Sequence, residues 1–393
     1  MFRVCKTNCV KIEHVNFFRV ERNLALLLLI ATILGLSLAN LGGISALDTF
    51  KAVDLRTPWV SLTLEGWVYN FGIPAFFALI GLELRRELHS GLFVQRKALV
   101  VPAVAAVLGV VVPALLYLAV TGFNSVASSG WPIPTATDVT FALAVYMLFG
   151  NTLPRAARVF LLAFAIIDDV IGILIITFLY SGALSVGPAL NALLLLLVFM
   201  FLGQLLLKNV NAAIRFAIAA AMVLTALIAI YETLAAGLQP TITGVLLGLL
   251  VPVAIGTRVE HTLHPWVAGL VLPLFAVMAA GVHISLADAW KEPVFWAILT
   301  RPVGKVLGIS LGAWLAAKAV GPISGLSNNA VVTVAFLGGI GFTVSLLFCQ
   351  ISFTVEPGIR SAATAATLIA AAISSIAGAI ALKTWPAKDA ERA

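Results

Sequence analysis

The sequence predicts an all-α polytopic membrane protein with twelve transmembrane helices. Of its 393 residues, 61% are hydrophobic and 10% are charged, and the mean hydropathy is +1.09. Soluble domains carry about 25% charged residues. The apolar residues also gather in stretches of about 20, the length that crosses a bilayer as a helix. No connection between these stretches exceeds roughly 25 residues, which leaves no room for a separate soluble domain.

The chain divides into a polar N-terminal tail over residues 1–23, a transmembrane domain over residues 24–382 and a C-terminal tail over residues 383–393. The first tail is too long for the start of a signal peptide and no small-residue cleavage site follows, so the first span is predicted to be retained. Glycine, proline, asparagine and charged residues separate the spans. The predicted spans are residues 24–44, 66–84, 98–120, 131–150, 159–180, 188–207, 212–231, 240–254, 264–283, 294–317, 329–352 and 361–382.

The lysine and arginine residues predict the orientation. With a cytoplasmic N-terminus, 18 of the 24 fall in inner segments and four, Lys51, Arg56, Lys291 and Arg360, fall in outer segments. Inner loops of membrane proteins carry this excess, so both termini are predicted to be cytoplasmic. The net charge of +7 follows the same topology and gives no reason to expect a nucleic-acid partner.

The segment of residues 45–64 follows the first span on the predicted outer side. Trp59 and Leu62 are residues typical of strands, and Asp54 and Pro58 are typical of turns. The sequence allows either a small hairpin outside the bilayer or an irregular loop.

Four ionisable residues fall at mid-bilayer depth: Asp138, Asp168, Asp169 and Lys305. A charge at that depth costs on the order of 3 kcal/mol on insertion scales, and two neighbouring carboxylates repel each other. Three carboxylates and one ammonium on three helices are hard to explain as structural ion pairs. We interpret them as the site of an ion or proton pathway.

The chemistry of this group suits a small hard cation, because such cations prefer oxygen ligands. Successive helical residues project about 100° apart, so Asp168 and Asp169 would flank one site from two sides. A buried carboxylate either holds a proton or binds a cation, and that competition is the simplest mechanism of exchange. Lys305 would be either a structural counter-ion of a carboxylate or a carrier of a transported proton.

Two spans contain residues that break helices, at 132–138 and at 338–343. Proline and glycine there would free backbone groups, and facing half-helix dipoles would need fixed charges such as Asp138 and Lys305. Arg301 lies one turn before Lys305 and next to Pro302. We expect its side chain to reach outward to the lipid headgroups.

The remaining candidates for metal binding are weak. Cys5 and Cys9 with His14 lack an evident fourth ligand, so we interpret the two cysteines as free thiols and expect Cys349 to be a small buried hydrophobe.

Several motifs, in their order and spacing, resemble the NhaA-type sodium–proton antiporter family. They are residues 81–88 (GLELRREL), 135–138 (TATD), 165–169 (AIIDD), 260–266 (EHTLHPW), 304–308 (GKVLG) and 339–343 (GIGFT). The resemblance covers nearly the whole membrane region. It implies an inverted-topology repeat in which the fourth and eleventh helices are broken and cross.

The resemblance also implies a function. Asp168 and Asp169 would bind the sodium ion and carry protons, with Asp138, Thr137 and Lys305 around them. The protein would be no enzyme and would need no cofactor; it would export sodium or lithium across the bacterial inner membrane, driven by roughly two inward protons. It would form a homodimer through residues 45–64.

The resemblance further implies activation at alkaline pH through a cytoplasmic cluster of Glu83, Arg85, Glu260, His261 and His264. Histidine titrates near neutrality, but solvated loop charges are the alternative reading of this cluster. Two departures bear on the response: Gln239 stands where the family often has a histidine, and the loop before the ninth helix is short.

Two other functions fit the same composition. A sodium-coupled solute symporter on this fold would need a roomier cavity with polar partners for the solute. A membrane sensor could use its buried charges only to report pH.

Overall fold

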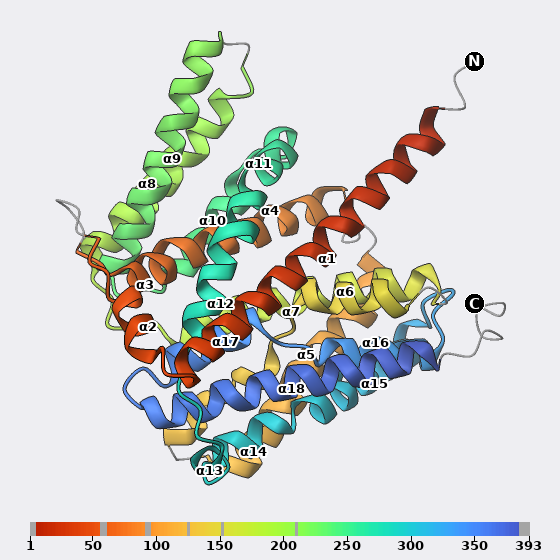
Figure 1. Ribbon diagram of the computed structural model, residues 1–393. Helices are drawn as coiled ribbons and strands as arrows, with labels where there is room; N and C mark the ends of the chain where they lie inside the picture. The colour runs from red at the N-terminus through yellow and green to blue at the C-terminus, as the bar shows by residue number, and fades with distance from the viewer. Residues whose placement is uncertain are drawn as a thin grey trace. The chain divides into compact units, whose positions relative to one another are not determined.

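The computed structural model describes residues 5–55, 61–90, 96–123, 126–150, 153–208 and 211–384 (Figure 1). Its regular structure is helical throughout these residues, apart from one isolated antiparallel β-bridge between Asp54 and Thr63. The prediction of an all-α protein is therefore confirmed for the part of the chain that is described.

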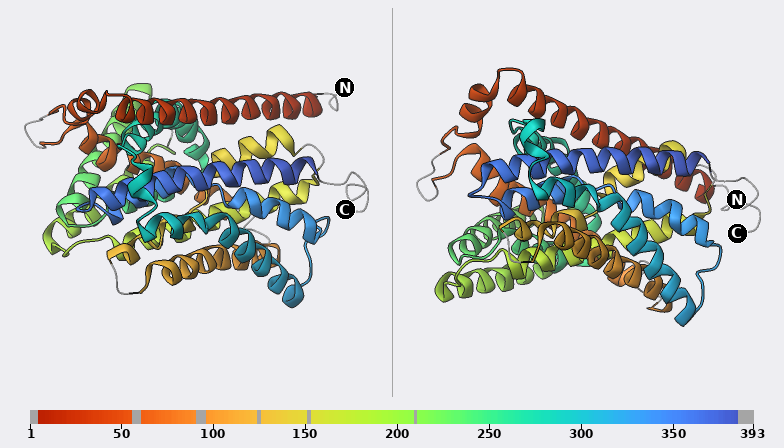
Figure 2. Two further views of the ribbon diagram at one scale, coloured as in Figure 1. Left: turned by 60° about the horizontal axis from the view of Figure 1, so that its bottom comes forward. Right: turned by 90° about the horizontal axis from the view of Figure 1, so that it is seen from below.

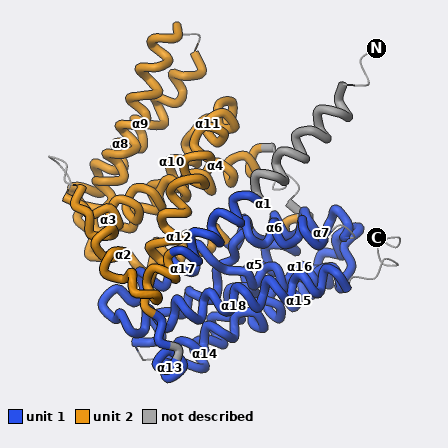
Figure 3. The backbone as a smooth tube through the Cα atoms, viewed as in Figure 1, with its two compact units in different colours: residues 1–34, 101–168, 284–393 blue, residues 35–100, 169–283 orange. Residues whose placement is uncertain are grey.

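The chain forms two compact units, each assembled from separate stretches of sequence (Figure 3). Helix α7 (Arg155–Leu179) belongs to both, since Asp168 ends a stretch of unit 1 and Asp169 begins a stretch of unit 2. Unit 1 holds residues 1–34, 101–168 and 284–393, with most of α1 (Cys5–Asn40) and α5 (Arg96–Thr121), then η3 (Val126–Gly130), η4 (Ile133–Thr135), α6 (Val139–Phe149), α13 (Leu286–Ala289), α14 (Pro293–Leu299), α15 (Arg301–Val320), α16 (Asn328–Gly338), α17 (Thr343–Ser352) and α18 (Pro357–Lys383).

Unit 2 holds residues 35–100 and 169–283. Besides the ends of helices shared with unit 1, it contains α2 (Ile44–Lys51), α3 (Leu64–Trp67), η1 (Val68–Gly72), α4 (Ile73–Ser90), α8 (Val186–Leu205), α9 (Ala212–Ala235), α10 (Pro240–Leu250), α11 (Val253–Trp266), η5 (Val267–Val271) and α12 (Leu272–Ala280). Helices α8 and α9 lie side by side in every view (Figures 1 and 2).

Glycines let the main helix pairs approach closely. A methyl group at Gly81 of α4 would meet the carbonyl oxygen of Val245 in α10. In unit 1, a methyl group at Gly308 of α15 would likewise meet the carbonyl oxygen of Leu108 in α5. Small residues at such contacts are a common device of membrane helices, which lack a hydrophobic drive to associate.

Nine helices among the described residues are long and apolar enough to cross a membrane, and two bent helix pairs raise this number to eleven. The predicted eighth span is α10, which has only 11 residues and is therefore about 16 Å long. That is shorter than the hydrocarbon core of a bilayer, about 30 Å. The chain is a multi-pass membrane protein, while twelve spans and an inverted repeat remain predictions.

Helix α1 begins at Cys5, so residues of the polar tail continue the helix of the first span, whose apolar part begins near Asn23 as predicted. One predicted boundary was wrong. Helix α11 begins at Val253, not near residue 264, because the polar residues that suggested a loop lie inside it. Pro265 is tolerated near its end, where the π-helical turn η5 takes over.

The segment of residues 45–64, which was predicted to lie on the outer side, contains more helix than expected. Helix α2 occupies Ile44–Lys51, and a short antiparallel pairing follows, in which Leu55 N–H donates to Leu62 O at 3.1 Å and Leu64 N–H donates to Val53 O at 2.8 Å. The sequence left a hairpin and a loop open, and this pairing favours the hairpin. Its tip, residues 56–60, lies outside the described residues.

Candidate functional site

Two helical spans of unit 1 are interrupted, as the proline and glycine residues predict. The segment that contains η3 and η4 meets α6 at a bend of 42°, and α16 meets α17 at a bend of 48°. In the first, Ala136 has extended backbone after the proline-containing turn η4. In the second, residues 339–342 separate the two helices and include Gly339 and Gly341.

The two breaks lie against each other and satisfy each other's backbone groups. The N–H of Asp138 donates to Ile340 O at 2.6 Å, and the hydroxyl of Thr137 donates to Gly338 O at 2.7 Å. Irregular backbone at membrane depth is tolerated only where its polar groups find such partners. The contact between the two breaks is therefore stabilised from both sides.

Asp138 lies at the N-termini of both half-helices. One carboxylate oxygen accepts from Phe141 N–H of α6 at 3.2 Å. The other accepts from Thr343 at the start of α17, from its N–H at 3.1 Å and its hydroxyl at 2.8 Å. A helix N-terminus carries partial positive charge, so one buried carboxylate serves two helix ends.

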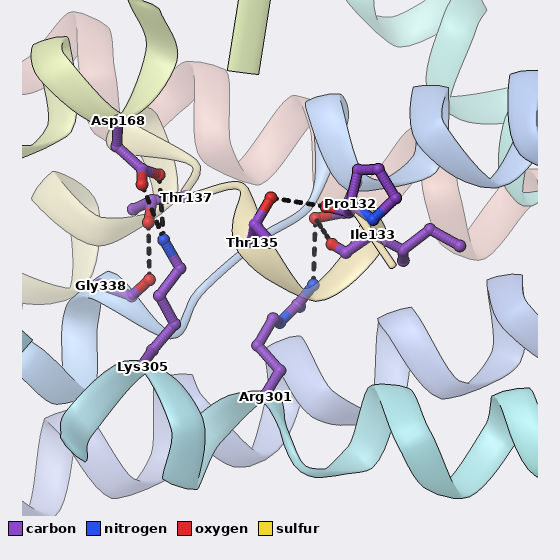
Figure 4. A network of polar contacts seen from close by, with 9 residues as sticks. Pro132, Ile133, Thr135, Thr137, Asp168, Arg301, Lys305 and Gly338 are labelled. Carbon is purple, nitrogen blue, oxygen red and sulfur yellow. Dashed lines mark hydrogen bonds and ion pairs between the residues drawn. The ribbon is translucent and has the colours of Figure 1, made fainter. Parts of the chain in front are cut away.

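Asp168 and Lys305 form a buried ion pair (Figure 4). The Lys305 ammonium donates to the two carboxylate oxygens of Asp168 at 2.9 and 3.1 Å. Asp168 is 2% exposed and Lys305 is fully buried. The Lys305 nitrogen also lies 5.4 Å from the ring centre of Phe164. Two charges without access to water depend on each other, so losing either partner leaves an uncompensated buried charge.

Thr137 joins this pair to the breaks. Figure 4 shows it beside the Asp168 carboxylate, while its hydroxyl holds Gly338 O. The structure thus brings Thr137, Asp138, Asp168 and Lys305 together around the two breaks. Asp169 follows Asp168 in α7 and is only partly buried, which agrees with side chains that project about 100° apart.

The prediction for Arg301 was wrong. Its side chain is fully buried and points inward. The guanidinium donates to Ser345 Oγ at 3.0 Å, to Gly341 O at 2.7 Å and to Thr367 O at 3.3 Å.

The physical reason for this inward position is the helix geometry. The predicted single span is interrupted at Thr300, and α15 begins at Arg301, with Pro302 in its first turn, where the missing N–H of proline is harmless. The break between α16 and α17 leaves carbonyl groups that need donors. The glycine-rich sequence predicts such carbonyls, but nothing along the chain indicates that Arg301 is their donor.

The predicted pH-response residues are only partly brought together. In unit 2, the Arg86 guanidinium donates to both carboxylate oxygens of Glu260 at 2.8 Å, and it lies 3.9 Å from Glu83 and 3.9 Å from Glu87. This acidic cluster, Glu83, Glu87 and Glu260 around Arg86, joins α4 to α11. Arg86 was not among the predicted residues, although its spacing from Glu83 by three residues is that of a helical ion pair.

Arg85 lies elsewhere than predicted. Its guanidinium donates to the carbonyl oxygen of Leu249, near the C-terminus of α10, where unpaired carbonyls attract cations. His261 and His264 lie on α11, which also carries Glu260; His261 is exposed and His264 is half-buried.

Gln239 occupies the N-cap position of α10, directly before Pro240. Its side-chain amide donates to the carbonyl oxygen of Tyr180 at 3.0 Å. It is therefore a structural link between the ends of two segments of unit 2.

Among the described side chains, no group of three histidine, cysteine or acidic residues could hold a metal ion. The side chains of Cys5, Cys9 and His14 lie outside the described part of the chain. Cys349 is buried and free, and its sulfur lies 3.5 Å from the Thr367 hydroxyl.

A membrane protein with two adjoining helix breaks and a buried ion pair beside them has features of a secondary transporter. The comparisons with known proteins agree. The family model described as Na+/H+ antiporter 1 matches residues 15–382. The chain therefore belongs to this family.

Individual relatives extend over most of the chain. The Na(+)/H(+) antiporter NhaA 2 of Clavibacter michiganensis subsp. michiganensis is 42% identical over 375 residues, which cover 93% of this chain and 91% of the relative. The Na(+)/H(+) antiporter NhaA 1 of Klebsiella pneumoniae is 34% identical over 395 residues, covering 95% and 97%. The Na(+)/H(+) antiporter NhaA of Escherichia coli O1:K1 is 34% identical over 384 residues, covering 93% and 97%.

Proposed function

We propose that this protein is an electrogenic antiporter that exports sodium or lithium in exchange for inward protons, at about two protons per cation. The observation that carries the proposal is the buried Asp168–Lys305 pair beside the two adjoining helix breaks. The antiporter names of its relatives support the same reaction.

In this proposal, sodium competes with protons and with the Lys305 ammonium for carboxylate oxygens. Asp168 is neutralised by Lys305 when no cation is bound, so an arriving sodium ion must displace the ammonium. Asp169 supplies the second carboxylate. Thr137 and Asp138 hold the adjoining backbone in place and so keep the site in shape.

The charge balance decides whether exchange is electrogenic. One sodium ion leaves and two protons enter, so each cycle moves one net positive charge inward. The protons come either from the two aspartates, or from one aspartate and Lys305 after it loses its carboxylate partner. The second route requires a lysine that is exchangeable and not needed for the fold.

We also propose the bacterial inner membrane as the location, with both termini cytoplasmic, on the basis of the lysine and arginine distribution. A homodimer through residues 45–64 and activation at alkaline pH belong to the same proposal. The acidic cluster around Arg86 is the candidate for the pH response. The comparisons do not favour the alternative of a sodium-coupled solute symporter.

The test is sodium-driven proton movement in proteoliposomes that contain the purified protein and a fluorescent pH dye. Addition of sodium or lithium chloride should move protons without any organic solute, whereas choline chloride should not. A membrane-potential dye should report charge movement in the same vesicles. Proton movement that needs an added solute would support the symporter. A complete absence of proton movement under all these conditions would support a sensor.

A further inference from the structure

Arg301 is a buried cation whose partners are all neutral oxygens. Its guanidinium reaches Ser345 of α17, Gly341 between α16 and α17, and Thr367 of α18. A buried charge without compensation is expensive, and here the compensation comes from carbonyl dipoles. The residue thus ties α15 to one helix break and to α18.

The contacts of Arg301 extend to the second break as well. The Ser345 hydroxyl, which accepts from Arg301, donates to the carbonyl oxygen of Ile133 in η4 at 3.0 Å (Figure 4). The chain from Arg301 through Ser345 to Ile133 therefore connects the carbonyl groups of both interrupted segments.

Gly341 is the point where this arrangement is tightest. A methyl group there would meet the carbonyl oxygen of Ala136, and would lie 2.6 Å from Ser345 Oγ and 2.8 Å from Arg301 Nη1. Only glycine fits between the Arg301 guanidinium and the break that contains Ala136. A larger residue at position 341 would push Arg301 and the two breaks apart together.

Asp138 and Arg301 compensate opposite partial charges at the two helix breaks. Asp138 accepts bonds from the N-terminal N–H groups of α6 and α17, which are the positive ends of those helices. Arg301 donates to the carbonyl oxygen of Gly341 in one break, and through the Ser345 hydroxyl it is linked to the carbonyl oxygen of Ile133 in the other. Lys305, one turn further along α15, directs its bonds to Asp168.

We propose that Arg301 is a positioning residue, the fixed cation that holds the two helix breaks together, and that Lys305 is the exchangeable partner of Asp168. The part of this inference that concerns Lys305 and sodium rests on the proposed function. The part that concerns the breaks does not.

The experiment compares three variants of the full-length protein: Arg301→Gln, Arg301→Lys and Lys305→Gln. Lys318→Gln is the matched control, because Lys318 is an exposed cation on the same helix and packs on Trp314. Melting temperature in detergent reports the fold. The KM for sodium and the maximal rate, corrected for the amount of reconstituted protein, report the site.

Arg301→Gln should raise the KM for sodium about tenfold or more, because a displaced break misplaces the groups around Asp168. Arg301→Lys should recover part of this loss; it keeps the charge, but an ammonium lacks the planar fork that reaches two acceptors. Arg301→Gln should also melt at a lower temperature than Lys305→Gln, and Lys318→Gln should match the wild type in every measurement.

An unchanged KM in Arg301→Gln would overturn the positioning role, whatever the loss in yield. A lower melting temperature for Lys305→Gln than for Arg301→Gln would show that Lys305 holds the breaks and would overturn the division of roles. If the wild type moves no protons with sodium, the proposed function fails. The order of melting temperatures then still decides whether Arg301 holds the breaks.

Discussion

Asp168 and Asp169 are neighbours in α7, yet their surroundings differ. Asp168 is buried against Lys305, whereas Asp169 is partly exposed. Removal of one partner of a buried ion pair costs about 3–5 kcal/mol, because the other charge stays buried alone. The same substitution at a partly exposed carboxylate has a much smaller effect on stability. The two aspartates should therefore behave alike in transport and differently in folding.

Asp168→Asn and Asp169→Asn should each abolish sodium-driven proton movement, and only Asp168→Asn should clearly lower the melting temperature. The double variant of Asp168→Asn with Lys305→Gln should recover stability without recovering exchange, since no charge is then left unpaired. Dye dequenching in proteoliposomes and thermal melting in detergent measure the two effects. Near-normal exchange in either single variant would contradict the role of the pair in binding sodium.

A substitution of Lys305 distinguishes between the two possible sources of the second proton, which are the second aspartate and Lys305 itself. If Arg301 holds the breaks, Lys305→Gln should fold and retain some exchange, but without net charge movement, because the lysine proton is missing from each cycle. A membrane-potential dye and a pH dye, read in the same vesicles, measure this difference. Full electrogenic exchange in the variant would exclude Lys305 as a proton carrier.

At the scale of helices, the pairing of α4 with α11 through Arg86 and Glu260 is the main departure from the predicted pH cluster. The Arg86 side chain is 41% exposed, so the pair contributes no more than about 1 kcal/mol to stability. Its larger effect should be electrostatic, since one arginine is shared by three carboxylates.

Arg86→Gln should move the rise of activity towards higher pH by up to about one unit, because loss of the arginine makes the local charge more negative, and a more negative field favours bound protons. The combination of Arg86→Glu with Glu260→Arg should restore most of the profile. Lys318→Gln serves as the control for loss of a positive charge. Identical pH profiles for Arg86→Gln and wild type would rule out this cluster as the pH-responsive element.

The start of α10 offers a second test at this scale. Gln239 cannot titrate, so the pH dependence must come from other groups, and competition between protons and sodium at the carboxylates is sufficient. We expect activity to rise with pH in the wild type and Gln239→His to shift the midpoint by less than about one unit. The pH profile of sodium-driven dequenching checks both, and a flat wild-type profile would contradict the competition mechanism.

For the whole molecule, the distribution of lysine and arginine predicts a topology that can be measured directly. A fluorescent protein fused after the last residue should fluoresce, and alkaline phosphatase at the same place should be inactive, because both report a cytoplasmic C-terminus. Phosphatase inserted beside Lys291, on the predicted outer side, should be active. Activity at the C-terminus would invert the orientation and with it the assignment of inner and outer clusters.

The sequence by itself determined the class of the protein and pointed to the charged residues that the structure buries together. Composition and the length of the apolar stretches were enough to predict a helical membrane protein, because a bilayer is spanned by apolar helices that satisfy their own backbone hydrogen bonds. The two helix breaks were predictable from proline and glycine, and the choice of Asp138, Asp168 and Lys305 followed from the expense of burying charge. These inferences rest on local properties that each segment carries alone.

The tertiary structure decided which charges meet. Arg301 turned inward and Arg86 replaced Arg85 in the acidic cluster, because the direction of a long side chain depends on acceptors that distant segments bring near it. Helix α11 began well before its predicted start, since polar residues mark a loop only when no neighbouring helix shelters or pairs them. Spacing along one helix limits where a side chain can point; only the packed neighbours select its partner.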